Sequence, residues 1–212
     1  MLYIIMCGGD YKFWDAPRQL TKINNEPIVA RTIRLLRENG VFDIAISSDN
    51  SVFEQFGVPV LRHDNRYEAK KIGVNNNNWV DAFYPTDFPT CYIFGDVVFS
   101  PEAIKTIVET ETDDIQFFAS APPFGAGYSK PWAEPFALKV VNTEHLRNAI
   151  NLTKQYTKQG LFRRNPIMWE LWQVIRATPL NCINYQNYVA INDYTCDIDN
   201  PAEADMFEKI IW

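Results

Sequence analysis

The chain has 212 residues, of which 47% are hydrophobic and 22% charged, and its formal net charge is −6. This composition excludes a disordered, collagenous or coiled-coil chain, and no apolar run reaches the ~20 residues that span a bilayer. The length suits one compact domain with a sizeable core, and the acidic balance argues against non-specific binding of nucleic acid.

In the first half of the chain, short apolar strands alternate with amphipathic helices. The expected strands are Leu2 to Cys7, Asp43 to Ser48, Val58 to Leu61, Cys91 to Phe94 and Ile115 to Ala119. The expected helices are Pro27 to Asn39 with a C-cap at Gly40, a helical stretch from Trp79 to Phe83, and Pro101 to Thr110. This alternation predicts βαβ units and a mostly parallel sheet.

The pattern loosens after residue 120. A Pro- and Gly-rich loop from Ala121 to Trp132 is followed by a strand, Phe136 to Val141, and then by helices at Thr143 to about Leu152, Ile167 to Arg176 and Ala202 to Ile211. We find no repeat or linker, so residues 1–212 are expected to form a single domain. Residues 1–120 are expected to bind a nucleotide, and residues 121–212 to recognise a second ligand.

Cysteine usage points to a reducing compartment. The four cysteines are far apart and form no Cys-x-x-Cys pair, which argues against a zinc knuckle or a redox pair. Cys7, Cys91 and Cys182 adjoin apolar residues and are expected to be buried free thiols. The first nine residues lack the basic region of a signal peptide, so we expect a cytoplasmic protein.

Polar residues follow several predicted strands, where ligands gather in open α/β sheets. Gly8-Gly9 can present backbone N–H groups to a phosphate, although a bare turn explains the pair equally well. Asp96 either reaches the same edge or caps the next turn. Either Asp197 or Asp199 could be only the N-cap of the last helix. Because alternation is expected to send them to opposite sides of a strand, we place Asp199, rather than Asp197, beside Asp96.

Two carboxylates and glycine-loop amides suit a Mg²⁺–triphosphate, since Mg²⁺ is held by one or two carboxylates together with phosphate oxygens. Asp96 and Asp199 are therefore the predicted metal ligands. Lys12, Arg18, Lys22 and Lys139 are candidates to neutralise the charge that develops in the transition state, although each also suits a solvated surface position. The chain has only two histidines, so few side chains are available to serve as the base of a Ser-His-Asp triad.

Collinear motifs resemble the nucleotidyltransferases of GT-A-like fold, which activate sugar, polyol or choline phosphates. The matching segments are Leu2–Gly9, Ala16-Pro17-Arg18-Gln19-Leu20, Phe94-Gly95-Asp96, Glu134-Pro135 and Asp199-Asn200-Pro201. The resemblance implies a Rossmann-like three-layer α/β sandwich with a mostly parallel mixed sheet. It also implies Mg²⁺-dependent transfer of a nucleotidyl group from a nucleoside triphosphate to a small phosphorylated acceptor. No general base is needed, because a phosphate monoester with a second pKa of about 6 is largely a dianion.

Three positions depart from the family pattern. The loop lacks the second glycine of Gly-x-Gly-x-Arg, Arg18 stands at the lysine of Pro-Lys-x-Leu, and Asn200 replaces threonine. The Cys7-Gly8-Gly9 form and the short chain most resemble small capsule-type cytidylyltransferases that make CDP-glycerol. The resemblance therefore favours CTP as the nucleotide and a glycerol phosphate as the acceptor.

The binding pockets complete the predicted site. Asn76 and Asn77 can read a base edge and Trp79 can stack on it, although a helix-capping loop fits equally well. Arg163 and Arg164 can clamp the acceptor phosphate or lie on a solvent or dimer face. The expected set is Arg18, Lys12 and Lys139 for catalysis; Cys7, Gly8, Gly9, Asn76, Asn77, Trp79 and Gly95 for the nucleotide; Asp96 and Asp199 for the metal; and Trp132, Glu134, Arg163 and Arg164 for the acceptor.

Other functions stay open. A thymidylyl- or uridylyltransferase acting on a sugar 1-phosphate, or a phosphocholine cytidylyltransferase, would carry the same motifs. A GT-A glycosyltransferase predicts Asp-x-Asp after the central strand, where this chain has Gly95-Asp96-Val97-Val98. A non-catalytic nucleotide-binding relative is a further alternative. Trp169 and Trp172 suit the core or a subunit contact, which leaves a homodimer open.

Overall fold

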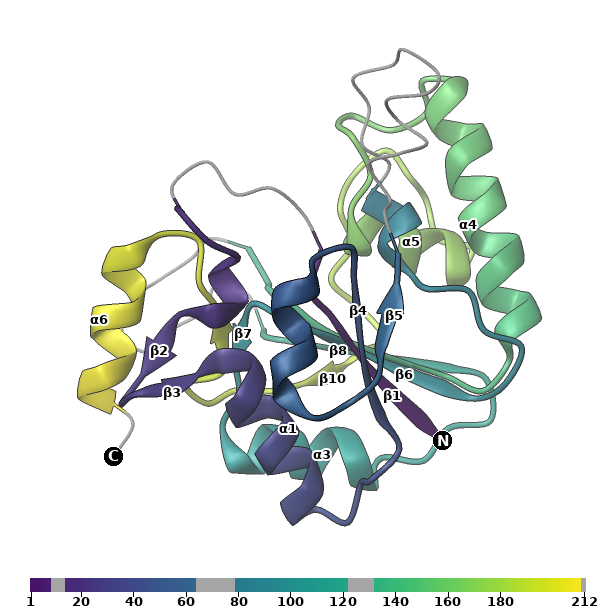
Figure 1. Cartoon of the computed structure of the whole chain (residues 1–212). Helices are drawn as coiled ribbons and strands as arrows, with labels where there is room; N and C mark the ends of the chain where they lie inside the picture. Colours follow the sequence, from purple (N-terminus) through teal and green to yellow (C-terminus); the bar gives the residue numbers. More distant parts are fainter. Residues whose placement is uncertain (9–13, 64–78, 122–131, 211–212) are drawn as a thin grey trace.

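The computed structural model describes residues 1–8, 14–63, 79–121 and 132–210, and all structural statements refer to these ranges. Its centre is a seven-stranded sheet in the order β10-β8-β9-β6-β1-β4-β5 (Figure 1). The strands are β1 Leu2–Met6, β4 Ile44–Ser48, β5 Val60–Arg62, β6 Thr90–Phe94, β8 Ile115–Ala119, β9 Pro135–Val140 and β10 Val189–Ala190. β9 runs antiparallel to β6 and β8, and the other pairings in this sheet are parallel. The predicted α/β fold with a mostly parallel mixed sheet is confirmed.

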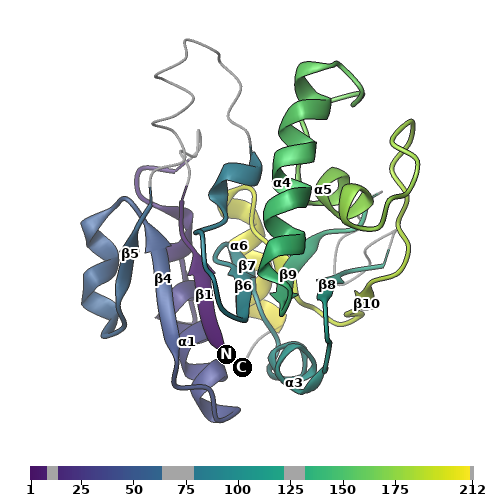
Figure 2. The ribbon, with the colours of Figure 1, turned by 90° about the vertical axis from the view of Figure 1, so that its right-hand side faces the viewer.

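Helices cover both faces of the sheet, as Figure 2 shows. α1 (Ile28–Glu38) and α3 (Pro101–Glu109) lie on one face, and α4 (Thr143–Lys158) and α5 (Met168–Ile175) lie on the other. Three short 3-10 helices are η1 (Arg18–Leu20), η2 (Ser51–Phe56) and η3 (Trp79–Ala82). Among the described ranges, no helix combines the length and apolarity needed to cross a bilayer.

The helix boundaries follow local sequence signals. α1 ends before Gly40, whose φ of +77° is the left-handed conformation that glycine adopts without strain. α4 runs six residues beyond the predicted end and stops before Gly160, at φ +68°. The prediction ended too early because it followed the apolar spacing, whereas the last turns of α4 are mostly polar. Arg31 of α1 is buried and donates from Nε to the Phe99 carbonyl at 3.1 Å.

A small second core fixes the closing segment of the chain beside the sheet. β7 (Val97–Val98) pairs antiparallel with β11 (Cys196–Asp197), and β2 (Lys22–Ile23) pairs with β3 (Glu26–Pro27). The last helix, α6 (Pro201–Ile210), packs on β2 at the side of the molecule (Figure 1). The buried residues that join these elements are Ile23, Ile28, Val98, Cys196, Ile198, Ala204 and Phe207. This cluster joins the segment after η1 and the closing segment of the chain to β7, which follows β6.

Gly95 lets the chain after β6 pass close to the end of β1. A Cβ atom added at Gly95 would lie 2.5 Å from the Met6 carbonyl oxygen and 2.7 Å from Cys7 Sγ. We therefore expect Gly95→Ala to lower the free energy of unfolding by about 1–3 kcal/mol through overpacking. Urea unfolding measures the loss. Gly160→Ala is the control: its Cβ meets open space, so only the left-handed backbone costs about 1 kcal/mol; a loss at Gly95 no larger than this would contradict the close approach.

The cysteines are free thiols, but they differ in accessibility. Cys7, Cys91 and Cys196 are buried, whereas Cys182 is exposed, so the expectation that Cys182 is buried was wrong. It lies in a loop after α5, where a neighbouring apolar residue does not guarantee burial. Burial raises the pKa of Cys91 to about 12, and that of Cys7 well above its usual value.

A thiol reagent is expected to modify one cysteine of the native protein quickly, at Cys182, and mass spectrometry identifies the site. Rapid labelling of Cys7 would contradict this packing.

Candidate active site

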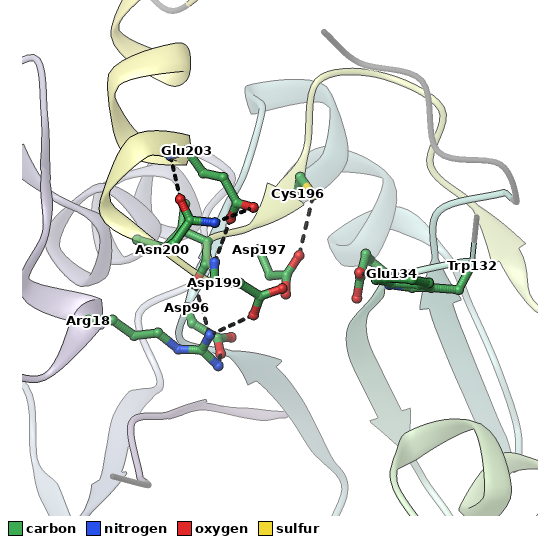
Figure 3. A network of polar contacts seen from close by, with 10 residues as sticks. Arg18, Asp96, Trp132, Glu134, Cys196, Asp197, Asp199, Asn200 and Glu203 are labelled. Atoms are coloured by element: carbon green, nitrogen blue, oxygen red, sulfur yellow. Dashed lines mark hydrogen bonds and ion pairs between the residues drawn. The ribbon is translucent and has the colours of Figure 1, made fainter. Parts of the chain in front are cut away.

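One guanidinium joins residues that lie far apart in the sequence. Arg18 Nη2 forms an ion pair with Asp96, and Nη1 donates to Asp199 Oδ1 at 3.0 Å and to the Ile198 carbonyl at 2.8 Å (Figure 3). The Arg18 and Asp96 side chains are only 15% and 18% exposed. Arg18, Asp96 and Asp199, which we call the Arg18 bridge, thus meet beyond the carboxyl end of β6, as predicted for the ligand edge of the sheet.

Backbone pairing brings the closing segment to this edge. β11 pairs with β7, so that Asp197 lies opposite Val97, and the Ile198 N–H donates to the Asp96 carbonyl at 3.1 Å. η1 is closed by a hydrogen bond from the Leu20 N–H to the Pro17 carbonyl at 2.9 Å. These bonds position the three members of the Arg18 bridge through the backbone.

Asp199 does not cap the last helix. Asn200 precedes α6, and its Oδ1 accepts from the Glu203 N–H at 3.3 Å. Glu203 in turn accepts from the Asp199 N–H at 2.6 Å and from Asn200 Nδ2 at 2.9 Å. Asn200 and Glu203 therefore satisfy the start of α6, and the carboxylate of Asp199 faces Arg18 (Figure 3).

Asp197 lies on the same side as Asp199. Carboxylate oxygens of Glu134, Asp197 and Asp199 lie within 4.8 Å of one another; we call these three residues the acidic group. The expectation that alternation separates Asp197 from Asp199 was wrong, because residues two apart in an extended strand face the same way. Sequence reasoning could have found this from the spacing alone.

The donor set fits a divalent cation. Three carboxylates supply the hard oxygen ligands that divalent cations prefer. Carboxylates at such short separation repel one another unless a cation lies between them. Glu134 is buried, Asp197 is half-buried and Asp199 is exposed, so the group lies between the protein interior and solvent. Asp199 belongs both to this group and to the Arg18 bridge, so a cation bound by the acidic group would lie beside the guanidinium.

Some of the residues predicted to bind the nucleotide lie at the carboxyl ends of β1 and β6. Ser48 Oγ donates to the Cys7 carbonyl at 2.7 Å, which holds the end of β1 against β4. Burial raises the Cys7 pKa, and the nearby charge of Asp96 adds to this effect, so the thiol stays neutral. Gly8 and Gly95 lie at the same edge as Cys7. The predicted Gly9, Lys12, Asn76 and Asn77 lie outside the described residues.

Trp79 packs beside the end of β6. Its ring lies edge-on to Phe94, with 5.4 Å between the centroids, and edge-on to Phe83 at 5.6 Å. The side chain is half-buried and contributes to the edge of the main core. A stacking role toward a base therefore stays a prediction, but the residue also serves packing.

Lys139 lies at the opposite edge of the sheet, so its predicted catalytic place was wrong. It pairs with Cys91 at the start of β6 because β9 runs antiparallel. Its ammonium is buried and donates to the carbonyls of Val108 and Thr110, at 3.0 and 2.6 Å, where α3 ends. Burial lowers the pKa of Lys139. We assign it to capping the C-terminal end of α3.

Of the residues predicted to bind the acceptor, Glu134 and Trp132 contact each other. Its N–H donates to Ser120 Oγ at 2.7 Å, and its carboxylate accepts from the indole N–H of Trp132, which is 46% exposed. Arg164 forms an ion pair with Glu170 of α5, and Arg163 is exposed. Trp169 and Trp172, for which core and subunit contact were both considered, are buried in the core.

Comparisons with solved structures support the fold. Comparison with family models and with curated protein sequences gave no match. A protein assigned as a glucose-1-phosphate thymidylyltransferase from Bacillus anthracis, crystallised with sucrose, is 13% identical with a TM-score of 0.57, and the match covers 99% of this chain and 94% of that one. The inositol-1-phosphate CTP transferase from T. maritima is 15% identical with a TM-score of 0.54, over 98% and 95% of the two chains. HddC from Yersinia pseudotuberculosis, in complex with GMP-PN, is 10% identical with a TM-score of 0.55, over 99% of each chain. Along nearly its whole length, the chain has the α/β fold of these solved structures.

Proposed function

We propose that the protein transfers a nucleotidyl group from a nucleoside triphosphate to the phosphate of a small sugar or polyol, with Mg²⁺ as cofactor. The observation that carries this proposal is the meeting of Arg18, Asp96 and Asp199 at the ligand edge, beside Glu134 and Asp197. Solved structures of the same fold are named as nucleotidyltransferases for thymidylyl and cytidylyl groups, which supports the reaction class.

The reaction is an in-line displacement. An oxygen of the acceptor phosphate attacks the α-phosphorus of the nucleotide, a new P–O bond forms, and the bond to the β-phosphate breaks with its electrons on pyrophosphate. Asp96 and the acidic group would hold Mg²⁺, which neutralises triphosphate charge. Arg18 lies beside these carboxylates and would stabilise the charge that develops on the phosphate oxygens. Positioning and neutralisation are sufficient, because the attacking phosphate is already a dianion.

We further propose that residues 1–120 bind the nucleotide and residues 121–212 the acceptor. Trp132 and Glu134 would contact the acceptor body and Arg164 its phosphate. CTP is the favoured nucleotide and a glycerol phosphate the favoured acceptor, on the resemblance of the Cys7-Gly8-Gly9 loop to capsule-type cytidylyltransferases. Buried free thiols suit a cytoplasmic setting.

The test is pyrophosphate release with Mg²⁺, with the four nucleoside triphosphates crossed against phosphates of glycerol, ribitol, hexoses and choline. We expect a single productive pair of nucleotide and acceptor, and the pair we favour is CTP with a glycerol phosphate. Asp96→Asn should abolish release without unfolding the protein. No pyrophosphate release across the whole panel, while calorimetry still detects nucleotide binding, would favour an acceptor outside the panel or a nucleotide-binding protein without catalysis.

A further inference from the structure

A buried carboxylate on α5 holds Arg164 in place. Arg164 Nε donates to Glu170 Oε1 at 2.6 Å, and the Glu170 side chain is 4% exposed whereas that of Arg164 is 51% exposed. The second oxygen, Oε2, accepts from the Ile167 N–H at 3.0 Å. Burial of a carboxylate is unfavourable unless both oxygens are satisfied. The ion pair therefore fixes the exposed Arg164 side chain to the buried helix α5.

The ion pair with Glu170 uses the Nε edge of the Arg164 guanidinium and not the edge formed by the two Nη groups. Only Nε meets Glu170, and neither Nη group of Arg164 has a hydrogen-bond partner within the described ranges. A guanidinium binds a phosphate bidentately with two N–H groups in one plane. Anchoring Nε sets the orientation of that plane and leaves the Nη groups available for an anion.

The pair lies on the acceptor side of the site. Trp169, next to Glu170 in the chain, donates from its indole N–H to the Ala133 carbonyl at 2.8 Å, one residue before Glu134. The ring of Trp169 contacts that of Tyr185, with 4.6 Å between the centroids. Burial raises the pKa of Tyr185, Arg164 lowers it, and Glu170 and Glu134 raise it further. Arg164, Glu170 and Glu134 thus all lie within electrostatic reach of one phenol.

We infer that Glu170 is a positioning residue for the acceptor phosphate: it fixes the Arg164 guanidinium so that its Nη groups meet the phosphate beside Glu134. This inference rests on the proposed function and adds to it, because it names a phosphate dianion as the group bound at Arg164. Glu170 acts only through Arg164 and touches neither ligand.

Glu170→Gln tests the inference, because it keeps the size of the side chain but removes its charge. We expect the acceptor KM to rise roughly tenfold, with kcat and the nucleotide Kd within about twofold of the wild type, since only one bound group loses its orientation. In an Arg164→Ala background, the same substitution should add nothing to the acceptor KM, because residues acting as one unit are non-additive.

Asn142→Ala is the matched control. Asn142 caps α4, the helix packed on α5, with Oδ1 accepting from the His145 N–H at 3.0 Å. Its loss should lower the melting temperature without raising the acceptor KM. An acceptor KM that rises equally in the control, or an effect of Glu170→Gln that persists in the Arg164→Ala background, would overturn the inference.

Direct binding separates this inference from the proposed function. Calorimetry with inorganic phosphate requires no turnover, and we expect Glu170→Gln and Arg164→Ala each to weaken binding, by roughly tenfold or more. A protein that releases no pyrophosphate in the panel but shows this loss would keep the anion clamp and contradict the proposed reaction with these acceptors. Phosphate binding that Glu170→Gln leaves unchanged, or that the wild type lacks, would reject the clamp.

Discussion

Arg18→Ala is expected to lower kcat by about 10²–10³-fold while strengthening the binding of a divalent cation to the nucleotide-free protein. The two effects have opposite signs because Arg18 has two roles. Without nucleotide, its guanidinium bridges Asp96 and Asp199 and neutralises both carboxylates. During turnover, it would meet phosphate oxygens whose charge is redistributed in the transition state. Removal of Arg18 exposes the carboxylates to the metal and takes away transition-state stabilisation.

Three measurements separate these roles. Electron paramagnetic resonance titration with Mn²⁺ gives the metal Kd without nucleotide, calorimetry gives the nucleotide Kd, and pyrophosphate release gives kcat. Arg18→Lys is the matched control: it keeps one charge but has no planar fork to bridge two carboxylates, so it should fall between the wild type and Arg18→Ala in both Mn²⁺ affinity and kcat. If kcat and nucleotide affinity fell by the same factor, Arg18 would contribute uniform binding and no transition-state stabilisation. Weaker Mn²⁺ binding would contradict the competition between arginine and metal.

Much of the scaffold follows from local sequence signals. β1 and β6 are continuous apolar runs, as expected for strands buried on both faces, and α1 carries its helical spacing up to Gly40. The glycine before Asp96 signals a close approach, and the structure places the Met6 carbonyl there. These features are local, so the sequence reports them directly.

Features that depend on pairing between distant segments could not be derived in this way. The direction of β9 decides which edge Lys139 reaches, and the apolar pattern of a strand is the same in either direction. The short β7–β11 pairing is only two residues long on each strand, which is too short to leave a periodic signal, yet it brings Asp197 to the site. The contact between Glu170 and Arg164 depends on how a loop folds back onto α5, and a pair of adjacent arginines does not indicate it.

Asp199→Asn is expected to lower kcat roughly a thousandfold or more, because Asp199 belongs to both the acidic group and the Arg18 bridge. The loss should be functional and not structural. Asp199 is 52% exposed, Asn200 rather than Asp199 caps α6, and the Asp199 N–H keeps its bond to Glu203 in the variant. The free energy of unfolding without metal should therefore change by less than about 1 kcal/mol, as for other exposed ion pairs.

Thermal unfolding with and without Mg²⁺ gives a readout that is independent of turnover. A ligand present at 100 times its Kd stabilises the native state by about 2.7 kcal/mol, so Mg²⁺ should raise the Tm of the wild type and not that of Asp199→Asn. Asp205→Asn is the matched control, since Asp205 is an exposed carboxylate in the middle of α6, the helix that follows Asp199. It should keep both the Mg²⁺ shift and full turnover. A Mg²⁺ shift that survives Asp199→Asn but is lost in Asp96→Asn would move the metal away from the acidic group and assign it to Asp96.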